Sequence, residues 1–166
     1  AIQGVINETA FISGNYAKIF EDNFADMYGV ENCISCANGT DAIYIALKAL
    51  GIGQNDEVIT VANTWISTAE TISQTGANPV FVDINPRTLS MDETQILKKI
   101  NKNTLAVFIT HAQGFNGLSK NLLKELKKKN ITLIEDVCES HGAKFESKKL
   151  GTFGLMSCFS FYYAHH

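Results

Sequence analysis

The chain has 166 residues, 45% of them hydrophobic, and a formal net charge of −3, which predicts a single globular domain with a sizeable core. No stretch approaches the roughly 18 apolar residues of a membrane span, residues 1–9 lack the pattern of a signal peptide, and the charge has no strong sign. We therefore expect no membrane and no nucleic-acid partner. Four cysteines lack the density of a secreted disulfide scaffold, which favours a reducing, cytoplasmic location.

Apolar residues recur at helical spacing over residues 15–28 and stop at Gly29. A short apolar strand is expected at 33–37, and a buried helix follows over 41–50. Strand and helix then alternate. Strands are expected at 58–61, 79–83, 105–109, 131–135 and 156–162, helices at 67–75, 91–100 with Ser90 as cap, and 120–129, and a small hairpin at 145–149.

Near-continuous apolar strands that alternate with helices are typical of parallel strands covered on both faces. The expected class is therefore α/β, with a doubly wound and mostly parallel sheet. Ligands of such sheets bind outside the carboxyl ends of the strands. The loops that matter are then 38–41, 63–65, 111–116, 136–141 and 162–166.

Asn38-Gly39-Thr40-Asp41 lies where the first expected strand turns into a helix. Glycine lets the backbone approach a ligand, and the helix amides with the Thr40 hydroxyl form an anion pocket. The simpler interpretation is a helix start capped by Thr40 or Asp41. Neither Gly-x-Gly-x-x-Gly nor a P-loop occurs, so a phosphate monoester is a better candidate ligand than a dinucleotide or a nucleoside triphosphate.

Asp136 and Trp65 also follow strands. An unpaired buried carboxylate is costly, so Asp136 requires a positive or protonated partner, such as the protonated ring nitrogen of a bound heterocycle. Its alternative role is a helix cap. Trp65, the only tryptophan, suits stacking on an aromatic ligand, although a core or interface position is the commoner role.

Two adjacent histidines, His165 and His166, close the chain directly after an aromatic strand, without the linker of an affinity tag. Neighbouring residues of a strand point to opposite faces, so one histidine acting as acid and base is favoured over a shared metal. His111 and His141 are expected to be hydrogen-bonded structural residues.

The cysteines carry no strong signal for a metal. Cys33 and Cys36 have C-x2-C spacing, but no second pair stands at a zinc-like distance along the chain. Cys138 and Cys158 are expected to be small core residues.

Eight motifs together resemble the DegT/StrS-type family of nucleotide-sugar aminotransferases. They are Gly39-Thr40-Asp41-Ala42, Leu50-Gly51-Ile52-Gly53, Asp56-Glu57-Val58-Ile59-Thr60, Gly76-Ala77-Asn78-Pro79-Val80-Phe81-Val82-Asp83, Ile134-Glu135-Asp136, His141-Gly142-Ala143, Gly151-Thr152-Phe153-Gly154 and Phe159-Ser160-Phe161-Tyr162. The resemblance implies a fold-type I, vitamin B6-dependent enzyme with a three-layer α/β/α large domain. Residues 1–166 would be the N-terminal part of that domain, without the C-terminal small domain, inactive alone and part of a homodimer.

The resemblance also implies roles for individual residues. Gly39 and Thr40 would hold the cofactor phosphate, with Ser160 donating a further hydrogen bond. Trp65 would stack on the pyridine ring, and Asp136 would pair with its protonated nitrogen. Glu139 stands near the ring hydroxyl, where the aminotransferases usually carry glutamine.

A larger departure falls at His165, where the aminotransferases place the Schiff-base lysine. The ending Tyr162-Tyr163-Ala164-His165-His166 is similar instead to a branch of 3-dehydratases. These use pyridoxamine 5′-phosphate to remove the C3 hydroxyl of a nucleotide-linked 4-keto-6-deoxy sugar, in deoxysugar and lipopolysaccharide biosynthesis. His165 would then be the acid/base residue, and an amino donor such as glutamate would regenerate the cofactor.

Two alternatives stay open: a pyridoxal phosphate-dependent sugar aminotransferase, and a non-catalytic cofactor- or sugar-binding homologue. One sub-branch of the dehydratases also holds an iron–sulfur cluster, and Cys138 stands where one cluster ligand lies. Its other ligands would come after residue 166, so residues 1–166 do not decide whether a cluster is present.

Overall fold

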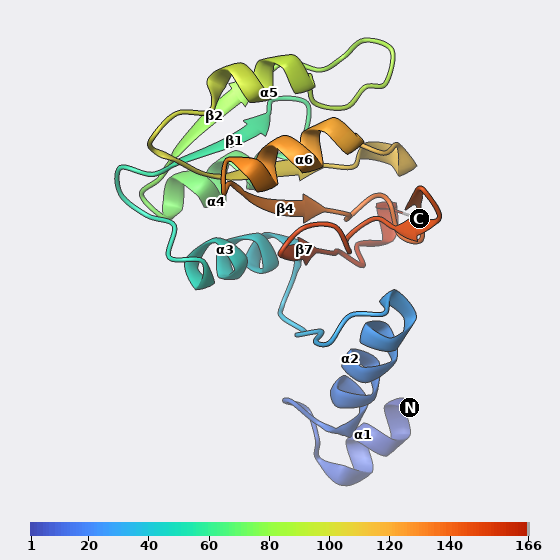
Figure 1. The fold of residues 1–166 in the computed structure, drawn as a ribbon. Coiled ribbons are helices and arrows are strands. Elements are labelled where there is room, and N and C mark those ends of the chain that lie inside the picture. The colour runs from blue at the N-terminus through green and yellow to red at the C-terminus, as the bar shows by residue number, and fades with distance from the viewer. Residues whose placement is uncertain (166) are drawn as a thin grey trace. The chain divides into compact units, whose positions relative to one another are not determined.

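The computed structural model describes residues 1–165, and the chain divides into two compact units, Ala1–Cys36 and Ala37–His166 (Figure 1). His166, the second of the two adjacent histidines, lies outside the described residues. Over the part of the chain that is described, no helix combines the length and the apolar character needed to cross a membrane.

The first unit contains two helices, α1 (Ile2–Glu8) and α2 (Asn15–Tyr28). Sequence periodicity predicted α2 and its end, and Gly29 takes the left-handed conformation (φ 67°) that such an end favours. The strand predicted at 33–37 is wrong. Its backbone binds a side chain instead of a neighbouring strand, since the amide and hydroxyl of Ser35 both donate to Glu21 Oε1 (2.8 and 2.7 Å).

The second unit is built on five parallel strands, in the order β2-β1-β3-β4-β7 (Figure 1). Their bounds are β1 Glu57–Val61, β2 Asn78–Val82, β3 Thr104–Thr110, β4 Thr132–Asp136 and β7 Met156–Cys158. Four consecutive residues of β1 and of β4 are buried, as expected of parallel strands covered on both faces. The α/β prediction is confirmed.

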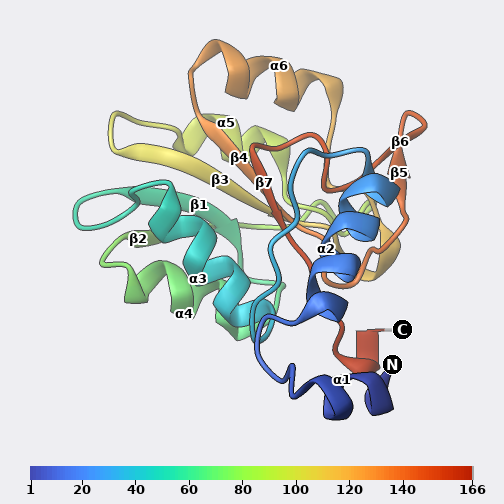
Figure 2. The same cartoon turned by 90° about the horizontal axis from the view of Figure 1, so that it is seen from below.

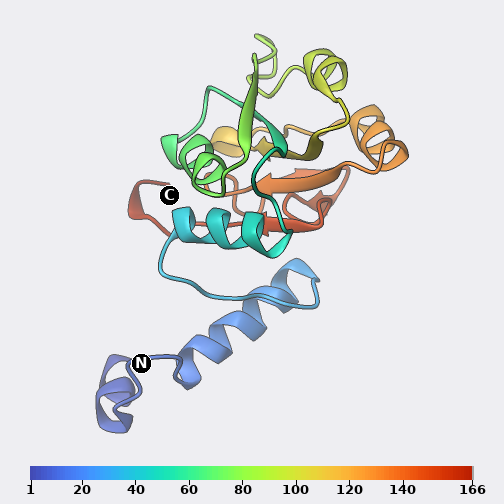
Figure 3. The same cartoon turned by 90° about the vertical axis from the view of Figure 1, so that its left-hand side faces the viewer.

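Two pairs of helices cover the two faces of this sheet. Helices α3 (Gly39–Ala49) and α4 (Ile66–Gln74) pack on one face, and α5 (Glu93–Lys99) and α6 (Lys120–Lys128) on the other (Figures 2 and 3). Side chains of a strand alternate between the faces. Thus Val58, Phe108 and Ile134 join the core under α3 and α4, whereas Ile59, Val107 and Leu133 join the core under α5 and α6.

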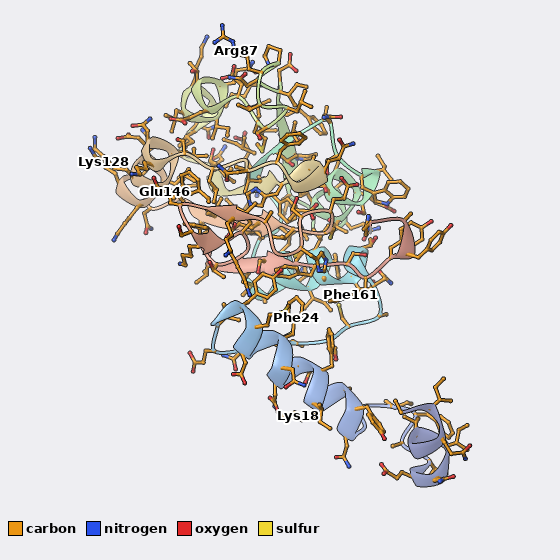
Figure 4. All side chains as sticks on the ribbon, turned by 90° about the vertical axis from the view of Figure 1, so that its right-hand side faces the viewer. Lys18, Phe24, Arg87, Lys128, Glu146 and Phe161 are labelled. Carbon is orange, nitrogen blue, oxygen red and sulfur yellow. The ribbon has the colours of Figure 1, made fainter. Side chains whose placement is uncertain are left out.

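A small hairpin, β5 (Lys144–Phe145) and β6 (Lys148–Lys149), confirms another prediction. Lys120 at the start of α6 forms an ion pair with Glu146 in the hairpin turn (2.7 Å). Figure 4 labels Glu146 on the same side of the unit as Lys128 of α6.

Two predicted boundaries are wrong, the end of the last strand and the start of α5. Strand β7 ends at Cys158, the partner of the last residue of β4, so the strand does not reach Tyr162. A 3-10 turn, η2 (Tyr163–His165), follows, and another, η1 (Ala112–Gly114), lies after β3. Helix α5 is capped by Asp92 instead of Ser90, because Met91 still forms a β-bridge with Ile84.

Candidate functional site

A cavity of about 640 Å³ lies at the carboxyl ends of the parallel strands. Its walls come from the start of α3, from the loops after β1, β3 and β4, and from the segment after β7. Parallel strands bring these loops to one edge of the sheet. The cavity is lined by all seven residues that the sequence singled out for catalysis or cofactor binding, namely Gly39, Thr40, Trp65, Asp136, Glu139, Ser160 and His165.

The start of α3 forms one wall. Asn38 caps the helix, and its Oδ1 accepts a hydrogen bond from the Asp41 amide (2.9 Å), whereas the sequence suggested Thr40 or Asp41 as the cap. The first amides of a helix have no intrahelical acceptor, so they favour an anion at this end.

Gly39 meets two other loops at close range. A Cβ placed on Gly39 would lie 3.0 Å from Ser160 Cβ and 3.6 Å from Cys138 Sγ. A contact of 3.0 Å is tighter than most Cβ contacts, so a side chain at residue 39 would require Ser160 to shift by a few tenths of an ångström. The start of α3 and the Ser160 side chain therefore lie close together.

Asp136 ends β4 and is 6% exposed. Burial raises the pKa of its carboxyl group, and the hydrogen bond that Oδ1 accepts from the Cys138 amide (3.0 Å) opposes this rise. The nearby Glu139 carboxylate raises the pKa further. Within residues 1–165 no lysine or arginine forms an ion pair with Asp136. A ligand that brings a cationic N–H would supply the missing partner.

Cys138 lies beside Asp136, and its thiol donates to the Cys158 carbonyl (3.9 Å). Burial and the Asp136 carboxylate raise the pKa of this thiol far above its usual range, so the group is a neutral thiol here. No set of three His, Cys, Asp or Glu side chains within the described residues is arranged to hold a metal ion.

His165 and Glu139 lie close together in the lining of the cavity. His165 Nδ1 lies 4.0 Å from Glu139 Oε1, and Glu139 Oε2 accepts a hydrogen bond from the Gln113 amide (3.2 Å). The amide of His165 donates to the Tyr162 carbonyl (3.0 Å), and its ring packs edge-on against Tyr162, with ring centroids 5.3 Å apart. The turn η2 therefore aims the imidazole toward the carboxylate, and no lysine lines the cavity in the described part of the chain.

Trp65 precedes α4 and is 73% exposed while lining the cavity. This exposure excludes a place in the core of its unit. A wide aromatic face toward a cavity is suited to stacking on a flat ligand.

His111 has the structural role that the sequence favoured. Its Nδ1 accepts from the Gly117 amide (3.0 Å), so Nε2 carries the proton and donates it to Glu135 Oε2 (3.0 Å). Glu135 also accepts from the amides of Gly151, Phe153 and Gly154 (2.8, 2.7 and 2.6 Å). Burial acts to raise the pKa of Glu135, but these hydrogen bonds outweigh it and hold the pKa below the usual range.

Several cavity residues were missed by sequence reasoning. Thr64 lies in a loop that the pattern marked, and its hydroxyl accepts from Thr110 (3.2 Å). Leu89 and Gln113 adopt left-handed backbones themselves (φ 57° and 52°), which their residue types disfavour, although Gln113 lies in the marked loop 111–116. Phe115, 51% exposed, follows Gln113 after the turn η1.

Comparison with known proteins places this site in context. A sequence model of the DegT/DnrJ/EryC1/StrS aminotransferase family matches residues 1–166. The chain is 38% identical over 161 residues to UDP-2-acetamido-2-deoxy-3-oxo-D-glucuronate aminotransferase of Pseudomonas aeruginosa, covering 97% of this chain and 45% of that protein. It is 39% identical over 149 residues to GDP-perosamine synthase of Escherichia coli O157:H7, covering 90% of this chain and 41% of that protein.

Among solved structures, the chain is similar to E. coli GDP-4-keto-6-deoxy-D-mannose-3-dehydratase with bound hydrated PLP. The TM-score is 0.91 at 32% identity, over 99% of this chain and 44% of that one. The chain thus spans less than half the length of the relatives it matches.

Proposed function

Because the chain belongs to the DegT/DnrJ/EryC1/StrS aminotransferase family, we propose that it forms the cofactor site of a vitamin B6-dependent enzyme acting on a nucleotide-linked keto sugar. The finer proposal is a 3-dehydratase of a 4-keto-6-deoxy nucleotide sugar with pyridoxamine 5′-phosphate as cofactor. The observation that carries it is a cavity that contains His165 and Asp136 but no lysine among its described lining residues.

The residues of the cavity fit the cofactor. The start of α3, where Gly39 lies in close contact with Ser160, would hold a phosphate between the helix amides, Thr40 and the Ser160 hydroxyl. Asp136 has a raised pKa and no basic partner among the described side chains, so a protonated ring nitrogen would stabilise its ionised form. Trp65 would cover one face of the ring.

When bound, pyridoxamine phosphate would supply the amine that reacts with the C4 ketone and the two electrons needed to reduce C3 as its oxygen leaves. The nitrogen would be released as ammonia, and an amino donor such as glutamate would restore the cofactor. His165 would carry out the proton transfers of this reaction. With Nδ1 toward Glu139, we assign Nε2 to the proton transfers, taking a proton from the reacting carbon and delivering one to the departing C3 oxygen, which leaves as water.

The second candidate is a sugar aminotransferase, which the activities named for the two sequence relatives favour. On a 4-keto sugar it would return a product that gains an amino group at C4 and keeps its C3 hydroxyl. A homodimer, as the resemblance to the family implies, and a cytoplasmic location belong to the same proposal.

A comparison of His165→Asn with Tyr163→Phe in the natural-length protein tests the role of His165. Tyr163 lies in the same turn, is 80% exposed and is not among the residues that line the cavity, so it serves as a matched control. We expect at least about 100-fold slower loss of the C3 hydroxyl for His165→Asn, in the range of general acid–base catalysis, and near-normal turnover for Tyr163→Phe. Unchanged turnover of His165→Asn would remove His165 from the mechanism.

A further inference from the structure

We propose that His141 is the positioning residue of the phosphate cradle, because it fixes the backbone of Ser160. This inference rests on the cofactor site proposed above. Ser160 lies two residues beyond the end of β7, where no strand ladder holds its peptide groups. Its carbonyl instead accepts a hydrogen bond from His141 Nε2 (2.9 Å). A carbonyl only accepts, so Nε2 carries the proton.

The imidazole of His141 is itself held on two sides. It packs edge-on between Phe159 and Phe161, with ring centroids 5.3 and 5.0 Å away and interplanar angles of 77° and 73°. Both phenylalanines flank Ser160 in the sequence. Residues 159–161 therefore both pack against the His141 ring and accept its hydrogen bond. Such edge-to-face contacts restrict the imidazole to one orientation.

The loop that carries His141 is anchored to the sheet. The preceding residue, Ser140, is 2% exposed; its amide donates to the Val137 carbonyl (3.0 Å), and its hydroxyl accepts from the Gly114 amide (2.9 Å) and bonds the His111 carbonyl. This loop begins at Asp136. His141 therefore transmits the position of the β4 loop, which bears the ring-binding carboxylate, to the segment that bears Ser160.

The side chain of Ser160 depends on that position. Its Oγ accepts from the Tyr162 amide (3.3 Å) and would lie 3.4 Å from a Cβ on Gly39. A hydroxyl must lie within about 3 Å of a phosphate oxygen to bind it. Rotation of the Ser160 peptide, once its carbonyl loses His141, would move the hydroxyl out of this range or against α3.

Binding of pyridoxamine 5′-phosphate and of pyridoxamine, measured by calorimetry on the natural-length protein, separates the phosphate contribution from that of the ring. We expect His141→Leu to weaken binding of the phosphorylated compound about tenfold, the range for one lost hydrogen bond, and to leave pyridoxamine within about twofold. His141→Gln places an amide N–H near the same point and should restore most of the affinity.

A double-mutant cycle with Ser160→Ala adds the decisive comparison. If His141 acts through Ser160, His141→Leu should cost less than about threefold in the Ser160→Ala background. Hydrogen exchange of residues 159–163 should quicken in His141→Leu but not in His141→Gln. These two results would support the proposal.

Equal losses for both compounds, or full additivity with Ser160→Ala, would overturn it. If the wild-type protein binds the two compounds equally, the proposed cofactor site itself is wrong. If the wild type prefers the phosphorylated compound and His141→Leu keeps that preference, the cofactor site stands and only the role of His141 fails.

Discussion

His165 Nδ1 lies 4.0 Å from Glu139 Oε1, while the other oxygen of Glu139 accepts a hydrogen bond from the Gln113 amide. The carboxylate is thus fixed by the loop after β3 and presented to an imidazole from the last turn of the chain. At 4.0 Å the two groups lie at ion-pair distance and beyond hydrogen-bond distance, so Glu139 would act on His165 through its charge. In the proposed dehydratase, Glu139 would stabilise the protonated form of His165 during the proton transfers.

Glu139→Gln tests this pairing. The amide oxygen can still accept from the Gln113 amide, but the charge that faces His165 is lost. We expect the turnover number to fall about tenfold at saturating cofactor, with the KM for the sugar nearly unchanged, because the loss lies in stabilising protonated His165 during proton transfer. If Glu139→Gln reached the wild-type turnover number once cofactor was saturating, Glu139 would act on cofactor binding alone.

Asp136→Asn should stabilise the protein without its cofactor and weaken cofactor binding. Burial raises the pKa of Asp136, so the ionised form costs stability at neutral pH, and that cost disappears as the pH falls through the raised pKa. Asparagine keeps an acceptor for the Cys138 amide and removes the charge. We expect a gain of about 1 kcal/mol in the free energy of unfolding at pH 7 and at least about tenfold weaker binding of pyridoxamine phosphate. A loss of stability would contradict this account.

Glu135→Gln should destabilise the fold by about 2–4 kcal/mol, because an amide N–H would face donors that now bind a carboxylate. The hydrogen bonds of Glu135 lower its pKa, so its contribution is complete above the usual carboxyl range and is lost as the pH falls through the lowered value. Urea denaturation between pH 3 and 7 should show this acid loss in the wild type and less of it in the variant. Glu146→Gln, at an exposed ion pair, should change the free energy by less than about 0.5 kcal/mol.

Asn38→Ala removes the cap of α3 and should cost about 1 kcal/mol of stability. Because the same helix start forms the proposed phosphate cradle, binding of inorganic phosphate should weaken in parallel. Asn38→Ser keeps a capping oxygen and should retain most of both. Normal phosphate binding by Asn38→Ala, despite lost stability, would separate the cap from the cradle.

The sequence was most informative where packing is repetitive. The strands in the second unit are apolar and buried, and the helices between them have strong periodicity. Pattern alone therefore predicted the parallel sheet and the edge at which the cavity lies. Since the site lies where strands end, the same pattern drew attention to Asp136 and Trp65. Their chemical roles, and that of His165, remain predictions that the experiments above address.

Prediction from sequence was poorest where a contact with a distant side chain determines the backbone conformation. Residues 33–37 look like a strand, but Ser35 binds Glu21 across 14 positions of sequence. The segment after Cys158 looks like a continuing strand, yet its pairing with β4 ends at Cys158. The Ser160 carbonyl accepts a hydrogen bond from the His141 side chain instead of from a neighbouring strand. Leu89 and Gln113 adopt left-handed backbones that their residue types disfavour. Contacts between distant segments impose these conformations, and local pattern does not encode them.

According to the proposed function, the enzyme removes the C3 hydroxyl of its sugar substrate and does not add an amino group. The most direct measurement is mass spectrometry of the sugar product after the natural-length protein is given pyridoxamine phosphate, glutamate and GDP-4-keto-6-deoxymannose, the sugar nucleotide named for the similar dehydratase. We predict a keto sugar lighter by one oxygen atom, formed by the wild type and lost in His165→Asn. An amino sugar that keeps its C3 hydroxyl would contradict the account.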